Sequence, residues 1–239
     1  MSTIGIFSAK GSPGVTTFAM ALATCGRDQG AVLIEADAAG GDLALRFGTA
    51  QQPGLAQLAA RVGQSPEERD LLDGLVHEPG AYGASEFAYV PAPIEPHAVG
   101  AALDVLAANP AILAQASRDR PVILDLGQLD HSRLRLVESC DVLALLVHGD
   151  PVSLGPACSA AWATQLDRPT GFVLVDTGPY KANEVAEVLA LRCWGVIPVT
   201  RRPLQTRRAQ RAVRALWADL TAAAMKSPPA PELAKASTR

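Results

Sequence analysis

The loop at residues 8–17 carries the residues whose types and spacing best fit a chemical task. It reads Ser-Ala-Lys-Gly-Ser-Pro-Gly-Val-Thr-Thr, after an apolar run at 3–7 and before a helix-like run at 18–26. Glycines let a backbone turn tightly, so that its N–H groups surround phosphate oxygens, and the helix N-terminus adds partial positive charge. The pattern predicts a phosphate cradle, and the alternative is a plain strand-to-helix turn.

This loop departs from the usual phosphate-binding sequence at one position. A P-loop reads G-x-x-x-x-G-K-[ST], and Val15 stands where that pattern has lysine. Pro13 also lacks the N–H that another residue would offer to phosphate. A charge-assisted hydrogen bond contributes about 1.5–3 kcal/mol. We therefore expect weakened nucleotide binding, and slow or absent hydrolysis.

Acidic residues follow two short apolar runs that are predicted to be buried strands. Glu35 and Asp37 follow the run at 31–34, and Asp125 follows the run at 121–124. An open α/β sheet presents the carboxyl ends of its strands to a ligand, and carboxylates are ligands that Mg²⁺ accepts. Asp125 is predicted to bind magnesium, with capping of a turn as the alternative. Asp37 could equally belong to an ordinary loop, and Glu35 is interpreted as an acid at the loop edge.

Strand-like and helix-like segments alternate along the rest of the chain. Strands are predicted at 3–7, 31–34, 87–90, 121–124, 141–147, 171–175 and 195–197. Helices are predicted at 16–26, 95–108, 111–117, 154–166, 183–191 and 203–225, with short helices within 51–80. This alternation predicts a three-layer α/β fold with a mostly parallel sheet and helices on both faces. We expect one domain over 1–226 and a disordered tail over 227–239, which is rich in Pro, Ala and Ser.

Composition excludes several classes of protein. The chain has 239 residues, of which 49% are hydrophobic, enough for one large domain with a sizeable core. Its net charge of −3 gives no overall attraction to nucleic acid. The four cysteines stand far apart without a C-x-x-C pair, which argues against a zinc site and indicates reduced thiols. No signal peptide or membrane-spanning run is visible, so we expect a cytoplasmic protein.

Residues 10–17 resemble the deviant Walker A motif of the ParA/MinD ATPases, usually K-G-G-x-G-K-[ST]. Lys10 falls on the family's signature lysine, which reaches across a nucleotide-sandwich dimer to the partner's phosphates. Thr16 matches the hydroxyl that binds magnesium, and Val15 replaces the lysine that contacts the β/γ-phosphates. The residues that the resemblance assigns to nucleotide contact are Gly11, Ser12, Pro13, Gly14, Val15, Thr16 and Thr17.

The same resemblance extends to two strands beyond the loop. Residues 32–37 are similar to the family's second strand, with Asp37 on the aspartate that helps to position the attacking water. Residues 122–125 are similar to the Walker B strand, with Asp125 on the position that orders magnesium through water. Together with Lys10, these two acids are the catalytic residues that the resemblance implies.

Two further segments resemble one branch of that family. Residues 41–45 and 87–93 are similar to runs of the CpaE/TadZ branch, which places pilus and secretion machinery at cell poles. The resemblance spans most of residues 3–200, in the family's order. It implies ATP and Mg²⁺ as cofactors and a homodimer that acts as a nucleotide-dependent switch or localisation factor. The alternatives are a scaffold that has lost nucleotide binding and a DNA-partitioning ATPase.

The C-terminal part of the domain is rich in arginine. The arginines are Arg201, Arg202, Arg207, Arg208, Arg211 and Arg214, and an apolar stripe shares their helix. One interpretation is a terminal helix that packs through this stripe and keeps its arginines in water. The others are a contact with an anionic membrane surface, which would make the protein peripheral at the membrane, or a contact with DNA.

Overall fold

A computed structural model gives the structure of the chain. It describes residues 2–10, 14–62, 70–79, 86–129, 134–159, 168–176, 178–198 and 206–227. Of the loop at 8–17, residues 11–13 lie outside this description, as do Arg201, Arg202 and residues 228–239 of the expected tail.

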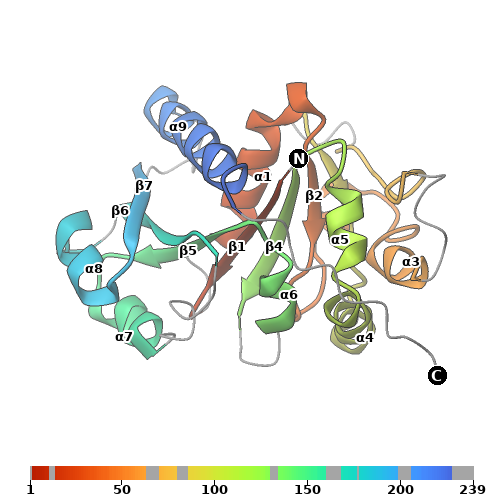
Figure 1. Ribbon diagram of the computed structural model, residues 1–239, viewed down its shortest axis with the longest axis horizontal. Helices are drawn as coiled ribbons and strands as arrows, with labels where there is room; N and C mark the ends of the chain where they lie inside the picture. Colours follow the sequence, from red (N-terminus) through yellow and green to blue (C-terminus); the bar gives the residue numbers. More distant parts are fainter. Residues whose placement is uncertain are drawn as a thin grey trace.

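The described strands form one parallel sheet, which confirms the predicted α/β class (Figure 1). They are β1 (Thr3–Ser8), β2 (Val32–Glu35), β3 (Ala88–Val90), β4 (Val122–Gln128), β5 (Val142–His148), β6 (Thr170–Asp176) and β7 (Arg192–Pro198). Their order across the sheet is β3-β2-β4-β1-β5-β6-β7, so that β1 lies at the centre. Every pairing between these strands is parallel.

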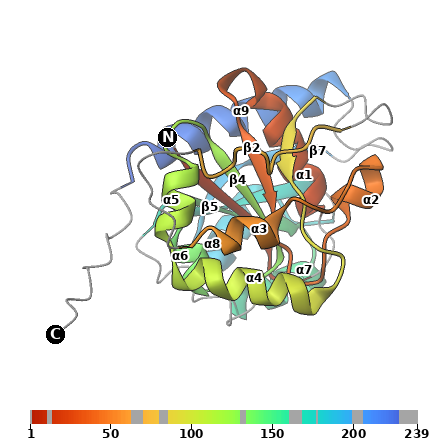
Figure 2. The ribbon, with the colours of Figure 1, turned by 90° about the vertical axis from the view of Figure 1, so that its right-hand side faces the viewer.

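Helices cover both faces of the sheet (Figure 1). They are α1 (Val15–Cys25), the 3₁₀ turn η1 (Arg27–Gln29), α2 (Leu43–Phe47), α3 (Leu55–Ala60), α4 (Pro96–Ala108), α5 (Ala111–Ala116), α6 (Leu134–Glu138), α7 (Pro151–Ser159), α8 (Ala182–Leu189) and α9 (Arg207–Ala224). One face carries α1 and α9, and the other carries α4 to α8. Seen from the β3 edge, α3 and α4 lie side by side (Figure 2).

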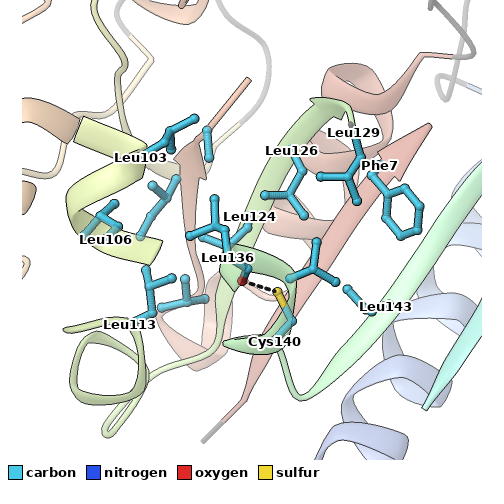
Figure 3. Close-up of a cluster of buried hydrophobic side chains, with 14 of the residues drawn as sticks. Phe7, Leu103, Leu106, Leu113, Leu124, Leu126, Leu129, Leu136, Cys140 and Leu143 are labelled. Atoms are coloured by element: carbon cyan, nitrogen blue, oxygen red, sulfur yellow. Dashed lines mark hydrogen bonds between the residues drawn. The ribbon is translucent and has the colours of Figure 1, made fainter. Parts of the chain in front are cut away.

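The strands are buried on both faces because their side chains alternate between two apolar cores. In β4, Ile123 packs toward α1 and α9, whereas Leu124 and Leu126 pack toward α4, α5 and α6. Figure 3 shows leucines of these three helices and of β4 in one cluster, with Phe7 of β1 at its edge. The Cys140 thiol lies in the same core, where it donates to the Leu136 carbonyl at 3.9 Å. All four cysteines are free.

Among the differences from the prediction, two boundaries and one additional helix have local physical reasons. Strand β4 continues four residues beyond 124, to Gln128, because its pairing with β1 extends to Ser8. Helix α7 begins at Pro151 because the Asp150 carboxylate accepts from the amides of Val152 and Ser153. Helix α6 was not predicted, and its five residues are too few to show a helical period.

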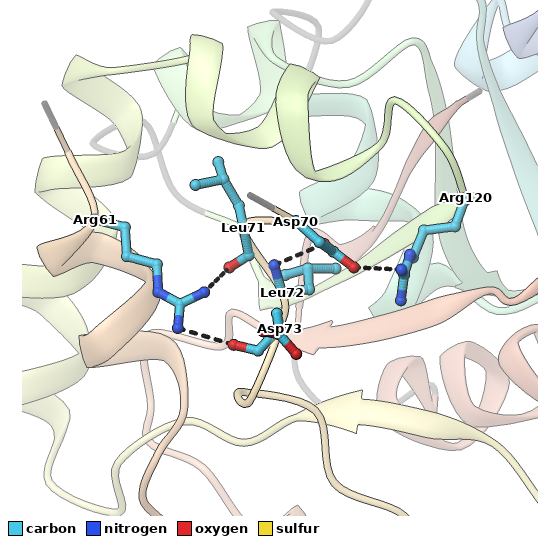
Figure 4. A network of polar contacts seen from close by, with 6 residues as sticks. All are labelled: Arg61, Asp70, Leu71, Leu72, Asp73 and Arg120. Atoms are coloured by element: carbon cyan, nitrogen blue, oxygen red, sulfur yellow. Dashed lines mark hydrogen bonds and ion pairs between the residues drawn. The ribbon is translucent and has the colours of Figure 1, made fainter. Parts of the chain in front are cut away.

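A polar network fastens the segment at 70–75 to the edge of the domain (Figure 4). The Arg61 guanidinium donates to the carbonyls of Leu71 at 2.7 Å and Asp73 at 2.8 Å. Asp70 accepts from the Leu72 amide and forms an ion pair with Arg120. These contacts hold the segment in place, although residues 71–75 form only turns.

Helix α9 packs through its apolar stripe, as one of the interpretations above predicted. Its buried residues are Ala209, Val213, Leu216, Trp217, Leu220 and Ala224. The exposed arginines on its other side are Arg207, Arg208, Arg211 and Arg214. The Trp217 ring lies so close to α1 that a Cβ added to Gly26 would stand 2.5 Å from it. Within the described residues, no helix combines the length and apolar character needed to cross a membrane.

Candidate functional site

The strand order predicts a ligand crevice at the carboxyl end of β1. The chain leaves β1 into α1 on one face of the sheet, but it leaves β4 and β5, the neighbours of β1, into α6 and α7 on the opposite face. Connections that leave on opposite faces open a gap at the strand ends, which is where open α/β sheets bind their ligands. The start of α1 and Asp125 meet at this place, where the Thr16 hydroxyl forms a hydrogen bond with the Asp125 carboxylate.

The described part of the loop ends in a left-handed turn that starts α1. Gly14 is the N-cap, with φ of 89° and ψ of 36°, a conformation that favours glycine. The eleven-residue helix α1 follows, and no acidic residue occupies its first turn. Among the described residues no side chain caps this helix end, and its positive dipole end suits a phosphate. The structure does not describe Gly11, Ser12 and Pro13, so their expected nucleotide contacts stay predictions.

Side chains at the two ends of the loop have different surroundings. Val15 is 6% exposed and belongs to the apolar core beneath α1, so it offers no polar group to the crevice. Thr16 and Thr17 are partly buried in the first turn of α1. Lys10 is exposed directly after β1 and makes no ion pair with another described residue. Lys10 is therefore the loop cation available to a ligand.

Asp125 is a fully buried carboxylate with one oxygen left unsatisfied. Its Oδ1 accepts from the Gly127 amide at 3.1 Å, whereas Oδ2 has no hydrogen-bond partner among the described residues. Burial raises the pKa of Asp125 to about 6, the Thr16 hydroxyl and the Gly127 amide lower it, and the charges of Asp37 and Asp42 raise it. A buried oxygen without a partner costs about 1–3 kcal/mol, more when it is charged, so this atom is suited to a ligand.

Asp37 lies beside Asp125, at the point where β4 passes Gly127. A Cβ added to Gly127 would stand 2.1 Å from the Asp37 carboxyl, and Gly127 has φ of 55°. Asp37 Oδ1 accepts from the Ala39 amide at 2.9 Å, which closes a small turn. Burial raises the pKa of Asp37 as well, with the Ala39 amide opposing the rise. The predicted strand end at 124 is wrong. Strand β4 continues to Gln128, so Asp125 and Gly127 both lie inside it.

Glu35 has a structural environment that differs from those of the two aspartates. It is 2% exposed, and it accepts from the amides of Asp42 at 2.7 Å, Leu43 at 3.0 Å and Ala92 at 2.8 Å. Burial raises the pKa of Glu35 to about 7 against the opposing effect of these three amides. Because both of its oxygens are bonded to backbone, Glu35 joins three segments and is not free to bind a metal.

The residues in the crevice fit a magnesium ion that is bound together with phosphate. Mg²⁺ keeps several waters and uses one or two protein carboxylates plus substrate oxygens, so it needs no cage of side chains. Asp125 Oδ2, the Thr16 hydroxyl and the nearby Asp37 are such oxygens. Consistently, no group of three or more His, Cys, Asp or Glu side chains in the described parts could hold a metal by itself.

The buried acids predict that the metal-free protein loses stability as the pH rises. The pKa of Glu35 is about 7 in the folded protein, compared with an ordinary value of 4.5. The pKa of Asp125 is about 6, compared with an ordinary value of 3.8. Raised carboxyl pKa values mean that the stability is fully present below about pH 4 and is lost as the pH approaches 7. We expect the melting temperature in EDTA to fall between pH 5 and about 7.5. A melting temperature that rises across this range would contradict the burial of charged acids.

Comparison with known proteins shows which fold this chain has. No protein-family model and no curated protein matches the sequence. Among solved structures, a ParA family ATPase from Chlorobium tepidum TLS superimposes with a TM-score of 0.68 and 19% identity, over 93% of this chain and 95% of that one. The cell division ATPase MinD of Pyrococcus furiosus gives a TM-score of 0.69 and 17% identity, over 92% and 98% of the two chains. The chain has the ParA/MinD fold.

A third structure of this fold contains a nucleotide. The septum site-determining protein MinD of Pyrococcus horikoshii OT3, in complex with Mg-ADP, has a TM-score of 0.69 and 16% identity, over 90% of this chain and 94% of that one. At these identities the likeness concerns the fold, so the assignment of individual residues depends on the geometry of the site itself. The predicted fold is thereby confirmed, whereas the deviant Walker A motif and the CpaE/TadZ branch stay predictions.

Proposed function

We propose that this chain is a nucleotide-dependent switch of the ParA/MinD type, which binds ATP and Mg²⁺ at the carboxyl end of β1. The observation that carries the proposal is the buried Asp125, whose Oδ2 lacks a partner among the described residues beside Thr16 at the start of α1. The left-handed Gly14 supports it, as does the first turn of α1, which has no acidic residue and no side-chain cap among the described residues. The ParA/MinD fold supports it too, since a MinD structure holds Mg-ADP.

Each polar residue of the site has a distinct proposed role. Thr16 and Asp125 would hold the magnesium ion, which neutralises phosphate charge when it is bound. Asp37 would orient the water that attacks the terminal phosphate, because its carboxyl rests against Gly127 beside Asp125. Lys10, exposed after β1, would contact the phosphates of its own nucleotide or of the partner in a homodimer.

Hydrolysis is proposed to be slow because Val15 supplies no charge where the phosphates lie. The Val15 side chain packs in the core, and Lys10 is left to offset the acids of the site. Phosphoryl transfer depends mainly on positioning and charge stabilisation, so a missing cation affects the transition state directly. Such a switch would be long-lived in its triphosphate state. This behaviour suits a factor that localises a pilus or secretion assembly.

Calorimetry separates this switch from a scaffold that has lost nucleotide binding. We expect measurable heat and a raised melting temperature with millimolar Mg-ATP, and neither effect in EDTA. The stabilisation follows from mass action, which gives about 2.7 kcal/mol at a ligand concentration one hundred times Kd. If millimolar Mg-ATP produces neither heat nor a thermal shift, the scaffold is the correct function.

The exposed face of α9 favours DNA partitioning as a second candidate. Arg207, Arg208, Arg211 and Arg214 point away from the packed stripe, and none of them forms an ion pair with another described residue. We expect replacement of Arg207, Arg208 and Arg211 by alanine to lower DNA affinity about tenfold or more at low salt, and to flatten its salt dependence. Fluorescence anisotropy with labelled duplex DNA measures this. An anionic vesicle in place of DNA tests a membrane surface with the same variant, and binding unchanged by the substitutions would exclude α9 as the contact.

A further inference from the structure

The side chain of Glu35 connects three backbone segments at one point. It stands at the end of β2, and its Oε1 accepts from Asp42 and Leu43, the first amides of α2. Its Oε2 accepts from Ala92, just after β3. A Cβ added to Gly41 would stand 2.7 Å from Oε2, so the backbone of the loop passes directly over the carboxylate. Both ends of the segment at 36–43 are therefore set by residue 35.

Asp37 lies within this anchored segment. The Gly41 amide donates to the Pro93 carbonyl at 2.8 Å, and the Gly40 amide donates to the Asp37 carbonyl at 3.1 Å. The Asp37 carboxyl in turn rests against Gly127, next to Asp125. We propose that Glu35 is a positioning residue, which fixes the segment at 36–43 so that Asp37 faces the magnesium–nucleotide site.

Glu35 and Asp125 lie side by side in the sheet, but their hydrogen bonds suit them to different roles. Glu35 and Asp125 are direct partners on the neighbouring strands β2 and β4, and both are buried. Asp125 keeps an oxygen without a described partner, whereas the oxygens of Glu35 are occupied by three amides. Aspartate at position 35 would be one methylene shorter, and glutamine would turn an N–H₂ group toward an amide donor. Glutamate is thus the side chain that reaches both α2 and β3 as an acceptor.

A double-mutant cycle tests whether Glu35 acts through Asp37. The inference rests on the proposed function, so the probe is Mn²⁺ bound with ADP, read by electron paramagnetic resonance without turnover. Asp37 lies beside Asp125 and would also hold a water of the metal ion, so we expect Glu35→Gln to weaken Mn²⁺ binding about tenfold, the lower end of effects seen for groups that orient metal ligands. In an Asp37→Asn background the same substitution is expected to change Mn²⁺ affinity less than about twofold, because coupled residues are not additive.

Hydrogen exchange and a matched control complete the experiment. We expect faster exchange across 36–43 in Glu35→Gln, and unchanged exchange in Glu187→Gln, which alters an exposed acid on α8. A Glu35 effect that persists in full without Asp37, or Mn²⁺ affinity that does not change, overturns the inference alone. A wild-type chain that binds no Mn-ADP overturns the proposed function together with it. If Glu35→Gln does not fold, Glu35→Asp enters the same cycle, with the same expected loss.

Discussion

Replacing Asp125 by asparagine is expected to abolish magnesium-dependent nucleotide binding while it makes the metal-free protein more stable. The loss should be about a hundredfold in the affinity for Mg-ATP, because a charged hydrogen-bonding or metal-binding partner is removed from a buried site. The gain follows from burial, since the pKa of Asp125 lies near 6 in the folded state instead of 3.8. At pH 8 we expect the free energy of unfolding in EDTA to rise by about 1–3 kcal/mol.

The two halves of this prediction are measured on the same sample. Calorimetry gives the affinity for Mg-ATP, and urea unfolding in EDTA gives the stability. Asp219→Asn, which changes an exposed acid on α9, serves as the control and should alter neither quantity. An Asp125→Asn protein that is less stable in EDTA but binds Mg-ATP normally would show that Asp125 is a structural acid.

Introducing lysine at position 15 should have the second large effect. Val15 is the first residue of α1, so the aliphatic part of the introduced side chain can stay in the core while its ammonium group reaches the loop. We expect Val15→Lys to raise both Mg-ATP affinity and the hydrolysis rate by about ten- to a hundredfold, the value of one charge-assisted hydrogen bond. The fit in the core is worse, so a loss of about 1–3 kcal/mol in unfolding free energy should accompany the gain.

Val15→Met is the matched variant, because methionine has similar length and no charge. Steady-state phosphate release and calorimetry should show wild-type behaviour for Val15→Met. Hydrolysis that stays at the wild-type rate in a folded Val15→Lys protein would mean that charge at this position is not what limits the reaction. Equal gains in both variants would assign the effect to packing at the start of α1.

The sequence predicts the strands that are buried on both faces. It does not predict features that depend on contacts between residues far apart in the chain. Continuous apolar runs such as 142–147 are typical of strands covered on both faces, so most strands of the sheet could be predicted. The end of β4 could not, because Asp125 inside the run looks like a terminus. Only the pairing of β1 with Gln128 shows that the strand continues.

The candidate site shows the same division. The family resemblance assigned Thr16 and Asp125 to one magnesium ion, and in the structure the Thr16 hydroxyl forms a hydrogen bond with the Asp125 carboxylate. Their binding of magnesium stays a prediction. Two residues were missed, because each acts through a partner distant in sequence. Gly127 matters since the Asp37 carboxyl occupies the space of a side chain there. Ser8, buried at the end of β1, donates to the Gly127 carbonyl at 3.4 Å, and a single serine carries no signal of this.

The contact between Trp217 and Gly26 has a mechanical consequence. The indole ring of α9 occupies the space above the C-cap of α1, so neither helix can slide along the other unless this contact opens. The arginines of α9 therefore belong to the same packed layer as α1, whose first turn follows the loop. A tilt of α1 would reorient that basic surface as one body, without an intervening hinge.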